Sequence, residues 1–327
     1  MYITPSRLQG TLSVPSSKSH TLRALLFAAL SKGISQIDRP LRSPDTLAMI
    51  EGIRQFGAEV WEENERIFVR GCSGKPKCPD DVIQCGNSGL MLRLLSGIAA
   101  LLPEYTIVTG DHSIRHNRPM KPLLSALDQL GVFATSSRGD GFAPVLIRGP
   151  IVCDHATLDG TDSQPVSALL IASSFALHPI RIEVEQPGEK PWIDFTLHWL
   201  KRVGIEVARE GYTHFSTKGS AQIEPFSMTI PGDFSTAAFP IAAALLTNSE
   251  LVLNHLDPED PQGDKALIAI LQQMGARITF DQNHLIVERG DRLRGMRIDV
   301  NPFIDALPIL AVLGCFAEGR TELVNGA

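Results

Sequence analysis

The sequence lacks the segments that would carry the chain into or across a membrane. Its longest apolar run, Ala306 to Ala317, is too short to span a bilayer. Its first residues, Met1 to Pro5, do not join a basic stretch to an apolar one, as a signal peptide does. We therefore expect a cytoplasmic protein without a membrane partner.

Cysteine is scarce, and no pattern of metal ligands stands out. The chain has five cysteines, an odd number, and their spacing matches no zinc motif. A reduced protein without disulfides is expected. We predict neither a metal site nor an organic cofactor. The cysteines are Cys72, Cys78, Cys85, Cys153 and Cys315.

Several signature motifs are also absent. The chain has no G-x-x-x-x-G-K-[ST] phosphate loop, no G-x-G-x-x-G fingerprint, no G-x-S-x-G elbow and no H-E-x-x-H motif. The net charge of −6 argues against a nucleic-acid partner, because proteins that bind phosphate backbones usually carry a basic face. A small anionic substrate held by a few local cations remains compatible with this charge.

A repeat of about seventy residues is the most informative feature that is present. A chain of 327 residues is long for one core, so two domains are expected. Four amphipathic helical patterns each end at a glycine, which indicates a helix C-cap. Two β-like stretches around a polar turn follow each glycine and predict a hairpin. These glycines are Gly57, Gly131, Gly204 and Gly275.

Each repeat also contains an earlier, Ala/Leu-rich helix followed by a short strand. The predicted unit is therefore helix, strand, helix, hairpin. The helices begin near Ser19, Ser88, Ser163 and Ser235. A fifth unit starts at Phe303, and we expect its strand, 321–324, to form an exposed edge without a hairpin partner.

The first helix start carries the strongest candidate for an anion site. Lys18, Ser19 and Arg23 stand where the helix begins. A helix N-terminus presents unpaired N–H groups and the positive end of the helix dipole. With two cations added, it favours a phosphate or a carboxylate. The alternative is an ordinary capped helix with solvated charges.

The next helix starts offer weaker candidates. The loop Gly86–Gly89 would let the backbone approach a ligand closely, while Arg93 could be a charge on the helix surface. Arg118 could bind a carboxylate or phosphate with two hydrogen bonds, or lie in a solvated turn. Gln164 could bind a substrate or cap its helix.

Asp305 stands in an otherwise apolar segment of the fifth unit. Such a carboxylate is either a helix N-cap or a group that transfers protons. The residues alone favour the N-cap. Asp233 is also a good N-cap for its helix.

In combination these motifs resemble the family of 5-enolpyruvylshikimate-3-phosphate synthases (EPSP synthases), the 3-phosphoshikimate 1-carboxyvinyltransferases. The resemblance implies an α/β fold, a two-domain inside-out α/β barrel of repeated units whose second domain is incomplete here. We expect residues 14–225 to form the three-unit domain, and 1–13 with 226–327 to form part of the other. The matching segments are Pro15–Arg23, Cys85–Gly89, Gly110–Met120, Asp162–Gln164, Lys190–Asp194, Pro231–Asp233, Gln262–Asp264 and Asp305.

The resemblance also implies a reaction and a site. The enolpyruvyl group of phosphoenolpyruvate would pass to the 5-hydroxyl of shikimate-3-phosphate, with release of phosphate, in the biosynthesis of chorismate and aromatic amino acids. Lys18 and Asp305 would be catalytic, with Asp305 taking the proton of the attacking hydroxyl. Shikimate-3-phosphate would contact Lys18, Ser19, Arg23, Ser163, Gln164 and Asp305. Phosphoenolpyruvate would contact Lys18, Gly89, Arg118 and Gln164. A monomer is expected.

The chain departs from the family's pattern at several positions. Leu90 stands where threonine is usual, and Trp192 where tyrosine is usual. Asp162 and Glu189 replace serines that the resemblance assigns to phosphate binding. Two carboxylates would repel a phosphate unless Lys190 compensates them or they point away.

The resemblance places a further basic segment of the family after position 327. We therefore expect the chain as written to have no transferase activity. One alternative is the transferase that acts on a UDP-amino sugar, but its usual cysteine is missing from the loop 111–120. Another is a non-catalytic or altered-acceptor homologue, which would explain Asp162 and Glu189. RNA-end cyclases share the repeat, but the acidic charge and the lack of a catalytic histidine motif argue against them.

Overall fold

The structure is a computed structural model that describes residues 6–326. The chain forms two compact units: unit 2 comprises residues 18–230, and unit 1 comprises 1–17 with 231–327. The helices of unit 2 are α1 (Lys18–Leu30), α2 (Pro44–Gln55), α3 (Gly89–Ala99), α4 (His112–Asn117), α5 (Lys121–Gln129), α6 (Ser163–Phe175) and α7 (Lys190–Arg202). Those of unit 1 are α8 (Phe234–Leu246), α9 (Ala266–Gln273) and α10 (Leu307–Phe316), with the 3-10 turns η1 (Gly263–Lys265) and η2 (Asn301–Ala306).

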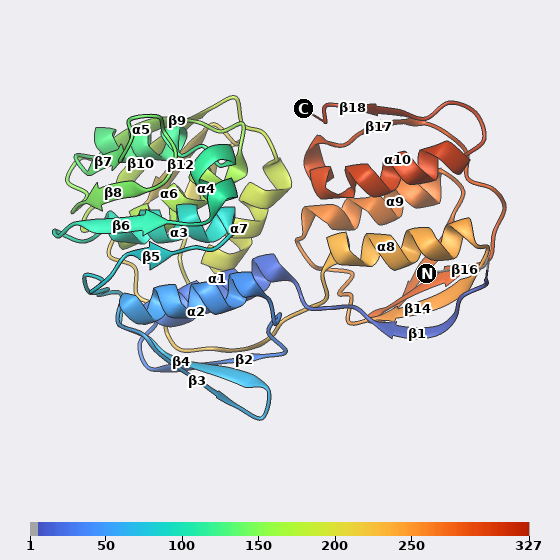
Figure 1. The fold of residues 1–327 in the computed structure, drawn as a ribbon, viewed down its shortest axis with the longest axis horizontal. Helices are drawn as coiled ribbons and strands as arrows, with labels where there is room; N and C mark the ends of the chain where they lie inside the picture. Colours follow the sequence, from blue (N-terminus) through green and yellow to red (C-terminus); the bar gives the residue numbers. More distant parts are fainter. Residues whose placement is uncertain (1–5, 327) are drawn as a thin grey trace. The chain divides into compact units, whose positions relative to one another are not determined.

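Three sheets of unit 2 follow one plan (Figure 1). Their strand orders are β13-β2-β4-β3, β5-β6-β8-β7 and β9-β10-β12-β11. In each sheet the first pair is parallel and the other two pairs are antiparallel. The strands are β2 (Ile34–Asp38), β3 (Glu59–Glu63), β4 (Arg66–Arg70), β5 (Ile83–Gln84), β6 (Thr106–Thr109), β7 (Phe133–Ser136), β8 (Val145–Arg148), β9 (His155–Asp159), β10 (Ile180–Glu185), β11 (Val207–Glu210), β12 (His214–Thr217) and β13 (Ser227–Thr229).

Unit 1 repeats this plan once, in the sheet β1-β14-β16-β15, and adds the parallel pair β17-β18. Its strands are β1 (Gln9–Ser13), β14 (Glu250–Asn254), β15 (Arg277–Asp281), β16 (His284–Glu288), β17 (Arg297–Asp299) and β18 (Glu322–Val324). The four predicted hairpins are therefore present. As expected, β18 has no hairpin partner and is an edge strand, but it pairs in parallel with β17, a strand that the sequence did not predict.

The four repeated glycines end their helices as predicted. Their φ angles, from +80° to +101°, lie in the left-handed region that glycine adopts without steric penalty. At the first of them, the N–H of Gly57 donates to the carbonyl of Arg54, and the N–H of Ala58 donates to that of Ile53. This is the Schellman pattern, and it recurs at the other three glycines. It turns each helix into the hairpin that follows.

Each four-stranded sheet contains an edge strand that the predicted unit omitted. The unit is strand, helix, strand, helix, hairpin. Two of these edge strands are exchanged along the chain: β1 precedes α1 but pairs with β14, and β13 precedes α8 but pairs with β2. Pairing of β13 with β2 moves the unit boundary from 225/226 to 230/231, and the other boundary lies at 17/18 instead of 13/14.

The first helix of each repeat in unit 2 is the buried one. In α1 every residue from His20 to Leu30 is buried, and α3 and α6 are buried almost as completely. Helices that are apolar on all sides belong in a core. No helix among residues 6–326 is both long and apolar enough to cross a membrane. The five cysteines are free.

Candidate active site

Three helix starts lie at one end of unit 2. Near their first residues, α3 and α6 meet, since a Cβ added to Gly89 would lie 3.6 Å from Oε1 of Gln164. They meet again further along, where a Cβ on Gly97 would lie 2.9 Å from the carbonyl oxygen of Ala168. The two helices are therefore parallel, and both N-termini point to the same end.

Helix α1 starts at this end too. Arg23 Nη2, in the second turn of α1, donates to Oγ1 of Thr196, which in turn donates to Oγ of Ser167 in the second turn of α6. Thr196 belongs to α7, so these two hydrogen bonds connect the second turns of α1 and α6 through α7. The starts of α1, α3 and α6 present N–H groups and positive dipole ends at one face, which favours a bound anion.

The structure brings together three residues that the family resemblance assigns to phosphoenolpyruvate binding. The Cβ position of Gly89 lies 3.5 Å from Cδ of Arg118, besides its approach to Gln164. Oε1 of Gln164 is buried and has no hydrogen-bond partner among the described residues. A buried acceptor of this kind indicates a missing donor.

Arg93 is not a surface charge, as it could have been from the sequence, but a buried residue. Its side chain is 2% exposed. Its Nη1 donates to the carbonyl of Gly89 at 3.1 Å and its Nη2 to that of Pro119 at 2.9 Å. Burial lowers its pKa, and the Asp162 carboxylate opposes that shift. Arg93 therefore ties the start of α3 to the residue after Arg118.

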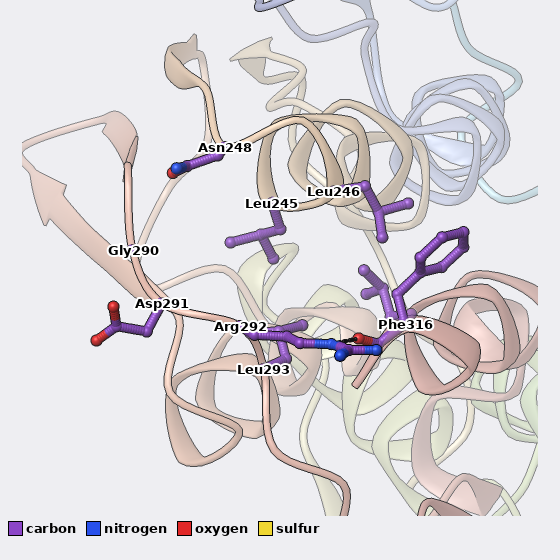
Figure 2. A pocket seen from close by; sticks show the side chains of 9 residues that line it. Leu245, Leu246, Asn248, Gly290, Asp291, Arg292, Leu293 and Phe316 are labelled. Atoms are coloured by element: carbon purple, nitrogen blue, oxygen red, sulfur yellow. Dashed lines mark hydrogen bonds between the residues drawn. The ribbon is translucent and has the colours of Figure 1, made fainter. Parts of the chain in front are cut away.

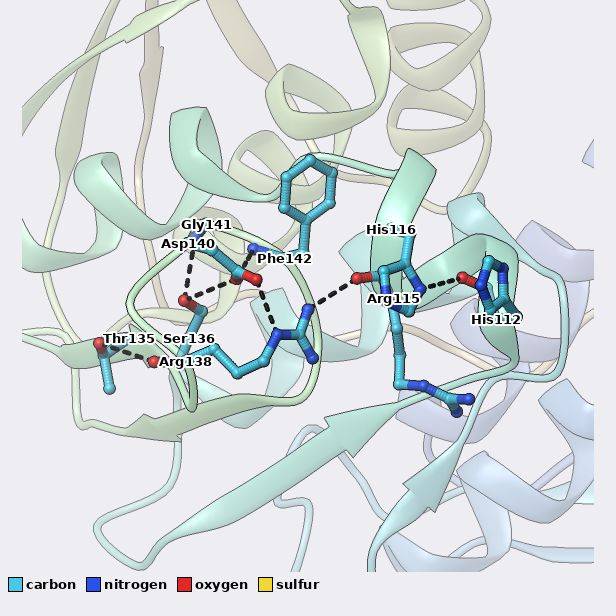
Figure 3. A network of polar contacts seen from close by, with 9 residues as sticks. All are labelled: His112, Arg115, His116, Thr135, Ser136, Arg138, Asp140, Gly141 and Phe142. Atoms are coloured by element: carbon cyan, nitrogen blue, oxygen red, sulfur yellow. Dashed lines mark hydrogen bonds and ion pairs between the residues drawn. The ribbon is translucent and has the colours of Figure 1, made fainter.

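The segment before Arg118 is held in place by hydrogen bonds from the loop between β7 and β8 (Figure 3). Arg138 Nη2 donates to the carbonyl of Arg115 at 2.7 Å, and Arg138 Nε donates to Asp140 at 2.7 Å. The N–H of Met120 donates to the carbonyl of Gly141. Arg115 itself bonds the carbonyl of Gly110 and is therefore engaged within the loop. These contacts fix α4, which ends next to Arg118.

Arg23 is buried between α1 and α7. Its side chain is 2% exposed, Nη1 donates to the carbonyl of Ser19, and its guanidinium lies 4.8 Å from the ring centre of Phe195. Burial lowers the pKa of Arg23 to about 9. Its Nε has no partner among residues 6–326. A role of Arg23 in holding a carboxylate stays a prediction.

Lys18 is the accessible cation of the first helix start. Its side chain is 52% exposed, and Nζ lies 3.5 Å from Oδ2 of Asp45. Because the ammonium of Lys18 is exposed and the pair is long, the contact contributes little to stability, and Lys18 can exchange Asp45 for another anion.

Two carboxylates occupy the start of α6, and they do not point away from it. Asp162 caps the helix, with Oδ1 accepting from the N–H of Gln164 at 2.8 Å. Glu189 Oε2 accepts from both the N–H and the hydroxyl of Ser163, at 3.2 and 2.7 Å. The ammonium of Lys190 lies 5.5 Å from the ring centre of Tyr212, where it makes a cation–π contact.

In unit 1, Asp305 is exposed within η2 and is not a helix N-cap. The turn η2 runs directly into α10, whose N-cap position is Ala306 without a side-chain cap in the described chain. The N-cap interpretation is therefore wrong, because backbone carbonyls of the preceding turn stand where a cap would act. Asp233 does cap α8, with Oδ1 accepting from the N–H of Thr236 at 2.8 Å.

Asp264 is a candidate that the sequence reasoning missed. Its side chain is 2% exposed, and Oδ1 has no hydrogen-bond partner among the described residues. Burial, then the charges of Asp305 and Asp233, raise its pKa from 3.8 to about 7. The segment Gln262–Asp264 was recognised only as one that matches the family. Its sequence does not show that the carboxylate of Asp264 is buried.

The sequence predicts no metal site, but one pair of histidines lies close together and could be considered as metal ligands. His112 and His116 are four residues apart on α4, with ring centres 4.2 Å apart. The described residues contain no group of three or more His, Cys, Asp or Glu side chains that could hold a metal. A two-residue set falls short of the three or four protein ligands usual for zinc.

Two cavities lie away from the candidate site residues, one in each unit. One, of about 270 Å³, lies in unit 1 between the ends of α8 and α10, where Arg292 Nε donates to the carbonyl of Phe316 (Figure 2). Another, of about 880 Å³, lies in unit 2 along α7 and β11. Neither is lined by a predicted site residue.

Comparison with known proteins places the whole chain in one family. The model of the family described as EPSP synthase (3-phosphoshikimate 1-carboxyvinyltransferase) matches residues 3–327. A 3-phosphoshikimate 1-carboxyvinyltransferase of Acetivibrio thermocellus is 41% identical, over 99% of this chain and 76% of the relative. One of Chlamydia muridarum is 42% identical, over 99% of this chain and 73% of the relative.

Solved structures agree. EPSP synthase from Acinetobacter baumannii has a TM-score of 0.81 at 26% identity, and the match covers 97% of this chain and 73% of that one. The enolpyruvyl transferase NikO from Streptomyces tendae, at 19% identity and a TM-score of 0.74 over 97% of this chain and 75% of its own, shares the fold. This chain therefore belongs to the EPSP synthase family and is a transferase with the inside-out α/β fold.

Proposed function

We propose that this chain transfers the enolpyruvyl group of phosphoenolpyruvate to the 5-hydroxyl of shikimate-3-phosphate and releases phosphate, a step in aromatic amino-acid biosynthesis. The observation that carries the proposal is the group formed by Gly89, Arg118 and Gln164 at the starts of parallel helices. Both substrates are anions, and this end of unit 2 combines helix N-termini with cations.

Each residue of the group has a chemical task in this proposal. Arg118 offers a planar fork of donors that matches a carboxylate or a phosphate. Gly89 has no side chain, so phosphoenolpyruvate can approach the backbone at the start of α3. The unpartnered Oε1 of Gln164 accepts a hydrogen bond from a hydroxyl of shikimate-3-phosphate. Lys18, exposed at the start of α1, supplies a mobile positive charge.

The reaction has two steps in which charge develops. The acceptor oxygen adds to the carbon of phosphoenolpyruvate that carries the phosphate, while the methylene carbon takes up a proton. The resulting methyl group then gives up a proton as the C–O bond to phosphate breaks, which restores the double bond in the product. Fixed donors and cations stabilise both transition states more than the ground state. Asp305, on unit 1, would take the hydroxyl proton, and Ser163 would line the acceptor pocket; both roles stay predictions.

Further properties belong to the same proposal. The enzyme would act in the cytoplasm as a monomer, without an organic cofactor or metal and without nucleic acid as a partner. Its two domains would be units 1 and 2.

Calorimetric titration with shikimate-3-phosphate, shikimate and a UDP-amino sugar tests the proposal. We expect shikimate-3-phosphate to bind and the UDP-amino sugar not to bind. Lys18→Ala should weaken binding of shikimate-3-phosphate about tenfold, since hydrogen bonds to charged groups contribute more than neutral ones. Lys201→Ala, which removes a lysine outside the site, is the matched control.

Phosphate release from phosphoenolpyruvate, measured with each acceptor, identifies the acceptor and also tests the expectation, implied by the resemblance, that the chain as written has no transferase activity. Release with the UDP-amino sugar, or binding of neither acceptor, would overturn the proposal. The alternative of a UDP-amino-sugar transferase is not favoured, because the curated relatives reported above carry the shikimate activity in their names.

A further inference from the structure

We propose that Glu189 acts as an internal competitor of the acceptor's phosphate, and that its carboxylate must leave the start of α6 before a phosphorylated acceptor binds there. The inference rests on the proposed function, because it concerns the acceptor pocket of that site. It makes Glu189 a specificity-determining residue: the wild-type chain discriminates less between shikimate-3-phosphate and shikimate than a chain without this carboxylate.

The first observation is the geometry of the carboxylate. Glu189 Oε2 accepts from the hydroxyl of Ser163 at 2.7 Å and from its N–H at 3.2 Å. A phosphate at a helix N-terminus uses donors of this kind. The two donors of Ser163 that face the start of α6 are thus already paired with an anion that belongs to the protein.

The second observation is a pair of buried polar atoms without partners in the described chain, on two residues at the start of α6 or in contact with it. Nε of Arg93 and Oε1 of Gln164 have no hydrogen-bond partner among residues 6–326, and the Arg93 side chain is 2% exposed. Nη2 of Arg93 lies 3.5 Å from Oδ2 of Asp162, the N-cap of α6. Buried polar groups in proteins are nearly always paired, so these atoms indicate a ligand near the start of α6, in which Nε of Arg93 would donate to an anion and Oε1 of Gln164 would accept from a hydroxyl.

The third observation is the backbone at Glu189. Its φ of +41° lies in the left-handed region, which residues other than glycine, asparagine and aspartate seldom adopt. The carboxylate that bonds Ser163 therefore comes from a turn held in an unfavourable conformation. Glutamine has the same branching as glutamate, so Glu189→Gln keeps the backbone conformation and removes only the charge.

Electrostatics gives the consequence for binding. A phosphate monoester carries between one and two negative charges near neutral pH, and it cannot share two donors with a carboxylate. Shikimate has no phosphate and leaves the pair between Glu189 and Ser163 intact. Removing the charge of Glu189 should therefore strengthen the binding of shikimate-3-phosphate and leave that of shikimate unchanged.

The test compares wild type, Glu189→Gln and Glu189→Ser by calorimetric titration with shikimate-3-phosphate, shikimate and inorganic phosphate. We expect both variants to bind shikimate-3-phosphate about tenfold more tightly, because hydrogen bonds to charged groups are the strong ones. Shikimate should bind all three proteins alike. Glu185→Gln removes an exposed carboxylate from the end of β10 and serves as the matched control, with wild-type affinities.

The outcomes separate this inference from the proposed function. Equal or weaker binding of shikimate-3-phosphate by Glu189→Gln, with shikimate unaffected, would overturn the inference and leave the function standing. If no variant bound shikimate-3-phosphate but Glu189→Gln bound inorganic phosphate more tightly than wild type, the function would fall and the competition would stand. A gain in shikimate binding equal to that for shikimate-3-phosphate would also overturn the inference, because the effect would then not involve phosphate.

Discussion

At Gly89 the protein leaves no room for a side chain. A Cβ there would lie 2.7 Å from Nη1 of Arg93, and that guanidinium is held by the carbonyls of Gly89 and Pro119. The clash cannot be relieved by a simple rotation, because the Arg93 side chain is buried.

Gly89→Ala should therefore weaken binding of phosphoenolpyruvate at least tenfold, because the displaced Arg93 and the new methyl group disturb the position of Arg118. Binding of shikimate-3-phosphate should change less. Calorimetric titration with each substrate measures both affinities. Wild-type affinity for phosphoenolpyruvate in a folded Gly89→Ala protein would contradict the assignment of Gly89 to that site.

A second prediction at this scale concerns Asp264, whose pKa is raised to about 7. Between about pH 4 and 7 the folded state binds more protons than the unfolded state, so the free energy of unfolding falls as pH rises through this window. Asp264→Asn cannot ionise and should be more stable than wild type at pH 8, by at most ~4 kcal/mol at ~1.4 kcal/mol per pKa unit. Near pH 4 the two proteins should be similar.

Urea unfolding at pH 4, 6 and 8 measures this difference. Asp281→Asn changes an exposed carboxylate on β15 of the same unit and is the control, with the pH dependence of wild type. Parallel pH profiles for wild type and Asp264→Asn would show that Asp264 is ionised in the folded protein.

At the scale of the helices and strands, the Schellman turn is the feature that recurs. Two of these turns have nearly the same backbone conformation and can be compared by the same substitution. Gly204 and Gly131 both end helices of unit 2, with φ angles of +82° and +80°. Around Gly204 a Cβ would meet no described atom within 4 Å, whereas at Gly131 it would lie 2.4 Å from Cγ2 of Val152.

Gly204→Ala should lower the free energy of unfolding by about 1 kcal/mol, the cost of a left-handed conformation for alanine. Gly131→Ala should lower it by more, because Val152 must also move. Urea denaturation of both variants gives the comparison. An equal loss at the two positions would mean that Val152 shifts without resistance.

For the molecule as a whole, the decisive feature is the presence of two separate hydrophobic cores. Leu169 lies in the core of unit 2 and Leu271 in that of unit 1, and both side chains are fully buried. Truncation of a buried leucine to alanine costs about 2–5 kcal/mol.

We expect Leu169→Ala to lower hydrogen-exchange protection first among the most protected amides of unit 2, and Leu271→Ala first among those of unit 1. Each variant is the control for the other. A uniform loss across both units from either substitution would mean that the chain unfolds as one cooperative body.

The sequence by itself determined the repeat, the hairpins and the helix ends. Glycine after an amphipathic helix favours a left-handed helix end because it has no Cβ, so Gly57 and Gly275 could be interpreted without any neighbour. Ser163 and Gln164 were recognised in the same way, because a helix start is a local property. Family membership also followed from motifs along the chain.

Only the tertiary structure decided which of these residues meet. The exchange of β1 and β13 between sheets depends on pairing between distant segments, which local patterns do not encode. The sequence around Arg93 and Asp264 does not distinguish them from ordinary surface charges. Both are important because the fold buries their side chains. Glu189 and Ser163 are 26 residues apart, so their hydrogen bond exists only because α6 and α7 begin side by side. Burial and long-range contact arise from packing, and therefore the chemistry of this site is a property of the fold.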